Sequence, residues 1–154
     1  MAKICEMKLN SAGKCVISDY KKVREFRKIL LKHSLKFGFS DKESYQIGLI
    51  FEELGINGLR HGAEKDPRVI VEYTFGPSGF ELSVKNKIES RQVNMKSIVK
   101  RNLRYIEAII SEKSKRKVKH GLGLVMVQKF SDKFHVNIKG DEFIAHVTKK
   151  RKED

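Results

Sequence analysis

The stretch that decides the fold is residues 50–62, which read IFEELGINGLRHG. Glu53, Asn57 and His61 are four residues apart, so on a helix they fall within roughly an 80° arc of one face. A carboxylate can orient or deprotonate water, an amide oxygen suits Mg²⁺, and an imidazole can donate a hydrogen bond to an anion. The same spacing is also typical of a polar, solvent-facing stripe on an ordinary amphipathic helix.

Glycines interrupt the same predicted helix. Gly48, Gly55 and Gly58 lie inside it, and each costs a helix roughly 1 kcal/mol relative to alanine. A helix that carries such residues needs another backbone or a ligand close by. A functional face and close helix–sheet packing explain these glycines equally well, and the sequence leaves both open.

The segment Glu53-x-x-x-Asn57-x-x-x-His61-Gly62 resembles the N-box of the GHKL superfamily, named for gyrase, Hsp90, histidine kinases and MutL. It is most similar to the anti-sigma-factor serine/threonine kinases, whose N-box helix also tends to end in His-Gly. The resemblance implies that Asn57 binds Mg²⁺ and that Glu53 is the catalytic base, which positions or activates a water or hydroxyl. It also implies that His61 belongs to the nucleotide site.

A second motif, Gly121-Leu122-Gly123-Leu124, precedes an apolar helix expected over residues 125–130. A glycine-rich turn at a helix N-terminus exposes free N–H groups and the positive end of the helix dipole, which favour phosphate. Alone, this pattern is equally typical of a tight loop-to-helix turn.

The position of this motif matches the G2 box of the superfamily, which follows the N-box, a hairpin and a flexible lid. The resemblance implies that residues 119–123 bind the nucleotide: Lys119, His120, Gly121, Leu122 and Gly123. Lys119 stands where the family usually has a further glycine. The basic residues 113–119 would lie in the lid and bind triphosphate oxygens, an acidic partner or neither.

The family's G1 box, D-x-G-x-G, has only a partial counterpart here. Asn86 stands at the position of the aspartate that accepts a hydrogen bond from adenine, and both glycines are absent. An asparagine oxygen can still accept that bond as a weaker, neutral partner. Lys87 and Ile88 cannot supply the conformational freedom or close approach of glycine. This departure bears on ATP affinity and base specificity.

The remaining pattern predicts the order of the elements. Residues 3–17 suit a strand or hairpin, Asp19 caps a helix that stops at Gly38, and Ser40 with Glu43 forms a capping box for the helix of the N-box. Hairpins are expected over residues 69–84 and 134–147, with a helix over 95–112 between them. This order predicts an α+β fold, a two-layer α/β sandwich whose mostly antiparallel sheet is covered by helices on one face, and the resemblance implies the Bergerat-type ATP-binding fold. We expect one domain over residues 1–148 and a basic, frayed tail over 149–154.

The net charge of +14 is spread along the chain, as on a solvated surface, and would attract acidic partners. It leaves a nucleic-acid-binding protein open as an alternative, although no aromatic residues interleave with a basic cluster. No apolar run approaches the roughly 20 residues that a membrane span needs, and the N-terminus lacks the apolar region of a secretory signal. We therefore expect a cytoplasmic protein without a membrane partner.

The resemblance implies an ATP- and Mg²⁺-binding regulator in signal transduction that phosphorylates or sequesters a protein partner, either a sigma factor or an anti-sigma antagonist. It would then be a serine/threonine kinase of the anti-sigma-factor type, and related kinases commonly dimerise. The alternative is an interaction module that keeps the fold and has weak or no ATP binding.

Overall fold

The structure is a computed structural model that describes residues 11–88 and 122–152. The predicted helix over 95–112 and the lid over 113–120 lie outside the described residues. The described helices and strands follow in chain order: β1 (Ala12–Ile17), α1 (Tyr20–Lys36), α2 (Asp41–His61), β2 (Val69–Gly76), β3 (Gly79–Lys87), α4 (Leu122–Phe130), β4 (Lys133–Lys139) and β5 (Glu142–Lys150).

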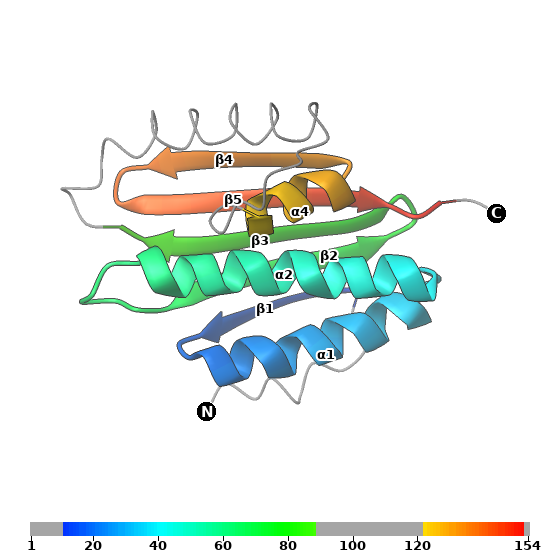
Figure 1. Cartoon of the computed structure of the whole chain (residues 1–154), viewed down its shortest axis with the longest axis horizontal. Coiled ribbons are helices and arrows are strands. Elements are labelled where there is room, and N and C mark those ends of the chain that lie inside the picture. Colours follow the sequence, from blue (N-terminus) through cyan, green and yellow to red (C-terminus); the bar gives the residue numbers. More distant parts are fainter. Residues whose placement is uncertain (1–10, 89–121, 153–154) are drawn as a thin grey trace.

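The strands form one sheet in the order β1-β2-β3-β5-β4, and every neighbouring pair is antiparallel. Figure 1 shows α1, α2 and α4 on the same side of this sheet, with α1 and α2 lying side by side across β1 and β2. The predicted α+β sandwich with an antiparallel sheet is therefore confirmed. Among the described helices, none is long and apolar enough to cross a membrane.

The core lies between the sheet and the helices. Alternate residues of β2, Val71, Tyr73 and Phe75, are buried on the helix side, as the period of a strand requires. From the helices, Phe26 of α1 and Phe51 of α2 meet this surface with ring centroids 4.7 Å apart. Burial of such aromatic side chains stabilises the layer contact by about 1.5–3 kcal/mol each.

The predicted helix ends are confirmed. Asp19 Oδ1 accepts a hydrogen bond from the Lys22 amide at 2.8 Å, and Gly38 follows α1 with a left-handed φ of 92°. Ser40 and Glu43 form the reciprocal capping box at the start of α2, with both hydrogen bonds at 3.1 Å. These local signals set both ends of α1 and the start of α2.

The C-terminal end differs from the predicted frayed tail, because β5 continues to Lys150. Lys149 is buried opposite Phe80, and its Nζ donates to the carbonyl of Phe130 at the end of α4 at 2.6 Å. Beyond the strand, Arg151 donates to the carbonyl of Pro77 at 2.7 Å, and the Lys152 amide donates to Glu43 Oε2 at 3.1 Å. Residues 149–152 are therefore tied to the body of the domain.

Candidate functional site

The polar face of α2 meets the first turn of α4 at one point. Gly123 lies so close to Glu53 that a β-carbon at Gly123 would overlap the carboxylate and stand 2.6 Å from Glu53 Cδ. Helix α4 begins at Leu122, three residues before the expected start at Val125, so Gly123 belongs to its first helical turn. We call Glu53, Asn57 and Gly123 the phosphate end, after the part of a nucleotide that the resemblance assigns to them.

The Glu53 carboxyl is half-buried, and this burial raises its pKa above the ordinary value for glutamate. The nearby charge of Glu52 raises the pKa further, whereas Arg60 lowers it. A carboxylate with a raised pKa is a stronger proton acceptor near neutral pH. Its environment therefore suits Glu53 to general-base chemistry.

Asn57 lies one turn beyond Glu53 and is also half-buried. Within residues 11–88 and 122–152 its carboxamide forms no hydrogen bond, and an amide oxygen is a ligand type that suits Mg²⁺. The N–H groups at the start of α4, the half-buried carboxylate and this amide oxygen are group types that suit a Mg²⁺-bound phosphate. His61 is the last residue of α2 and is exposed, so it lies at the rim.

Asn86 lies elsewhere, on the sheet-facing side of α2. It is 6% exposed, and its oxygen lies 3.4 Å from the position that a Gly58 β-carbon would take. Its Nδ2 donates to the carbonyl of Lys87 at 3.3 Å, and the same carbonyl accepts the Ala63 amide at 2.8 Å. We call Gly58, Gly62, Asn86 and Lys87 the base end, after the adenine contact that the resemblance assigns to Asn86.

The helix glycines are explained by packing. Gly48 and Gly55 face α1, where a β-carbon would stand 3.1 Å from Arg27 Cγ and 3.3 Å from Val23 Cγ1. At Gly58 a β-carbon would overlap Val69 of β2. Of the two explanations that the sequence left open, close approach of α1 and of the sheet accounts for all three positions.

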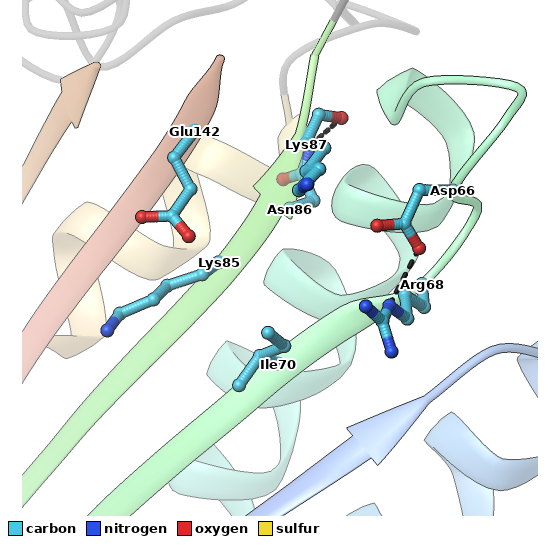
Figure 2. A pocket seen from close by; sticks show the side chains of 7 residues that line it. All are labelled: Asp66, Arg68, Ile70, Lys85, Asn86, Lys87 and Glu142. Carbon is cyan, nitrogen blue, oxygen red and sulfur yellow. Dashed lines mark hydrogen bonds and ion pairs between the residues drawn. The ribbon is translucent and has the colours of Figure 1, made fainter. Parts of the chain in front are cut away.

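Next to the base end the surface has a small hollow with a volume of about 30 Å³. Figure 2 shows the side chains that line it, with Lys85 and Glu142 on the side of the sheet away from the helices. A hollow of this size has room for about two water molecules, whereas small-molecule pockets usually measure about 300–1,000 Å³. The hollow therefore does not suit a nucleobase.

Three predicted site residues, Lys119, His120 and Gly121, lie outside the described residues. Leu122 is the first residue of α4. Lys149 was missed as a support of the site, although it holds the far end of the helix that carries Gly123. Its signal is in the sequence, because Ala145, Val147 and Lys149 alternate on the buried face of β5.

A sheet covered on one face by helices, with a carboxylate of one helix against a glycine in the first turn of another, is consistent with the class of GHKL-type ATPase domains. The chain belongs to the family described as the histidine kinase-like ATPase domain, which matches residues 16–145. The resemblance drawn from the N-box is thereby confirmed.

Solved structures support the same fold. A chain in the crystal structure of the SiaB–SiaC complex from Pseudomonas aeruginosa matches with a TM-score of 0.61 and 15% identity, over 88% of this chain and 86% of that chain. No curated protein matches this sequence.

Proposed function

We propose that this protein binds a Mg²⁺-nucleotide through the phosphate end and acts as a regulator by phosphorylating or sequestering a protein partner. The observation that carries the proposal is the contact of Glu53 with Gly123, which joins two distant motifs at one point. The histidine kinase-like ATPase family supports nucleotide binding. The regulatory role follows from the resemblance of the N-box to the anti-sigma-factor serine/threonine kinases.

Each residue of the phosphate end has a role in this proposal. The oxygen of Asn57 holds Mg²⁺, and the N–H groups of the first turn of α4 donate to phosphate oxygens. Glu53 accepts the proton of the attacking hydroxyl on the partner, for which its raised pKa is suited. The bound nucleotide supplies the phosphoryl group, and the protein contributes mainly positioning and charge neutralisation.

The partner is proposed to be another protein. The structure with which this chain shares its fold was solved as a complex of SiaB with SiaC. Because that similarity rests on 15% identity, we propose only the class of partner, a protein whose serine or threonine hydroxyl can reach Glu53. A sigma factor, an anti-sigma antagonist or a second copy of the chain in a homodimer belongs to the same proposal.

Calorimetric titration with ATP, in the presence of Mg²⁺ and of EDTA, tests nucleotide binding. We expect Mg²⁺-dependent binding to the native chain and a loss of about tenfold or more in affinity for Asn57→Ala, equivalent to about 1.4 kcal/mol. Asn137→Ala is the matched control, because Asn137 is an exposed asparagine on β4. Equal affinities of the Asn57→Ala and native chains would contradict the assigned role.

A second function is favoured by the burial of Asn86. The chain would then be an interaction module that keeps the fold and binds its partner without nucleotide. In that case titration with ATP gives no heat. Thermal unfolding with millimolar ATP also shows no rise in Tm, whereas a ligand that binds only the native state must raise Tm.

A further inference from the structure

We infer that His135 and His146 form a binding site for a transition-metal ion of the Zn²⁺, Ni²⁺ and Cu²⁺ class, on the face of the sheet opposite the helices. The inference goes beyond the proposed function and does not depend on it. It follows from the register of β4 with β5, which brings two histidines of neighbouring strands together.

The two histidines stand directly opposite each other. His135 of β4 pairs with His146 of β5, and their ring centroids are 5.0 Å apart. Ala145 and Val147 are buried on the helix side of β5, so the alternation of the strand places His146 on the opposite face. His135 is exposed and His146 is half-buried, so an ion from solvent can reach both rings.

The separation of the two rings suits one shared ion. A zinc–nitrogen bond is about 2.0–2.1 Å long and a ring centroid lies about 1.2 Å behind the bonded nitrogen, so each centroid would stand about 3.2 Å from the ion. Centroids 5.0 Å apart then subtend about 100° at the ion, close to the tetrahedral angle of about 109° that protein-bound zinc usually adopts. The pair therefore has the ring spacing of a two-histidine metal site.

Ser83 of β3 extends the pair into a row across three strands. It stands opposite His146 in the register of β3 with β5, and Ser83 Oγ and His146 Nδ1 are hydrogen-bonded at 2.9 Å. When Nδ1 carries the proton and donates to Ser83 Oγ, the lone pair of the ring is on Nε2, the nitrogen that binds the metal. Histidine ligands commonly donate their second ring N–H in this way, which fixes the tautomer and the ring orientation. Ser83 is therefore a positioning residue of the site.

The surroundings of the pair select the class of ion. Four residues flank it on the same face of β4 and β5, and none carries a carboxylate: Lys133, Asn137, Ile144 and Thr148. Mg²⁺ and Ca²⁺ prefer oxygen ligands, whereas imidazole suits Zn²⁺, Ni²⁺ and Cu²⁺. In the part of the chain that the structure describes, no three histidine, cysteine, aspartate or glutamate side chains gather to hold a metal. Water would complete the coordination, so we expect weaker binding than at a four-ligand zinc site.

A bound ion would tie a strand at the edge of the sheet to its neighbour. β4 is the last strand in the order of the sheet, next to β5 (Figure 1). Because the two rings meet only in the native register, the ion binds the folded chain in preference to the unfolded chain and stabilises it. We expect Zn²⁺ to raise Tm and to slow amide hydrogen exchange in β4 and β5.

Calorimetric titration of the whole chain with Zn²⁺ tests the site, with Mg²⁺ as the control ion. We expect Zn²⁺ to bind, Mg²⁺ to give no heat at the same concentrations, and His135→Ala to lose about tenfold or more in Zn²⁺ affinity. Asn137→Ala, on the same face of β4, is the matched control and should keep the native affinity. Absence of Zn²⁺ binding, or equal Zn²⁺ affinities of the native chain and His135→Ala, would overturn the inference.

Two further measurements sharpen the test. In NMR spectra of the native chain, Zn²⁺ should shift the imidazole signals of both His135 and His146, and shifts confined to other histidines would overturn the inference without any variant. Ser83→Ala should lower Zn²⁺ affinity about tenfold, whereas Ser83→Thr, which keeps the hydroxyl, should retain it. Equal Zn²⁺ affinities of these two variants would remove Ser83 from the site. Failure of any of these tests leaves the proposed function standing, because none of these residues belongs to the phosphate end.

Discussion

The phosphate end and the base end each include residues of α2. They differ in the side chains that surround their glycines, Gly123 and Gly58. At the phosphate end, the carboxylate of Glu53 occupies the space that a side chain at Gly123 of α4 would take. At the base end, Gly58 faces the branched side chain of Val69 and the buried amide of Asn86. Glycine thus admits an ionisable side chain of a neighbouring helix in one place and apolar packing in the other. The identity of the residue does not distinguish the two uses.

The largest expected effect is on stability at the base end. In Gly58→Ala, the added methyl group overlaps Val69 in the buried layer, and we expect the free energy of unfolding to fall by about 2 kcal/mol despite the better helix propensity of alanine. Unfolding by denaturant measures this free energy in the native chain and in the variant. Gly55→Ala is the control, because Val23 need shift by only a few tenths of an ångström there. Equal stability of the two variants would contradict the assigned packing.

At the phosphate end the corresponding substitution should affect ligand binding. In Gly123→Ala, the methyl group takes the space beside Glu53, and we expect tripolyphosphate affinity to fall about tenfold, or about 1.4 kcal/mol. Stability should change little, because the Glu53 carboxylate can rotate away. Gly76→Ala is the control, since no atom lies within 4 Å of its β-carbon position. Unchanged affinity in Gly123→Ala would remove Gly123 from the site.

A smaller effect is expected from the support of α4. Lys149→Met keeps the aliphatic chain and loses the hydrogen bond to the Phe130 carbonyl, at a cost of about 1 kcal/mol. We expect faster amide hydrogen exchange in residues 122–130, with β2 and β3 unchanged. Lys150→Met, at the exposed neighbouring position, serves as the control. If exchange in α4 were unaffected, Lys149 would not position the helix of the phosphate end.

The smallest effect concerns the charge of Glu53. Since folding raises the pKa of this carboxyl, the folded state binds a proton more tightly than the unfolded state, and stability falls as pH rises from the ordinary glutamate pKa through the raised value. Glu53→Gln removes this cost, so we expect Tm at pH 7.5 to rise by at most a few degrees. The gain should vanish as the pH is lowered below the ordinary pKa. Glu81→Gln, at an exposed position of β3, is the control and should give no pH-dependent gain in Tm. A lower Tm for Glu53→Gln at pH 7.5 would contradict a cost of burying the ionised Glu53 carboxylate.

Much of the fold could be predicted because its signals are local. The Asp19 cap, the Ser40–Glu43 capping box and the alternation in β2 and β3 depend on residues near one another in the chain. The N-box spacing likewise identified Glu53 and Asn57 as neighbours on one helix face. The assignments of Lys119, His120 and Gly121 stay predictions.

The tail and the base end could not be predicted in the same way. Lys149 reads as part of a basic tail, and only the pairing of β5 with β3 places it in the core beside α4. Asn86 is interpreted as a weaker acceptor for adenine, and only the approach of β3 to α2 buries its carboxamide beside Gly58. Such contacts join residues far apart in the sequence, which periodicity does not encode.

By itself, the sequence determined the class of protein and the order of the described helices and strands, because helix and strand periods and caps act within a few residues. The residues that bind phosphate stay a prediction. Tertiary structure alone decided which side chain each glycine packs against, Glu53 at Gly123 and Val69 at Gly58. Whether a polar side chain faces a ligand or the backbone depends on the approach of a distant strand or helix.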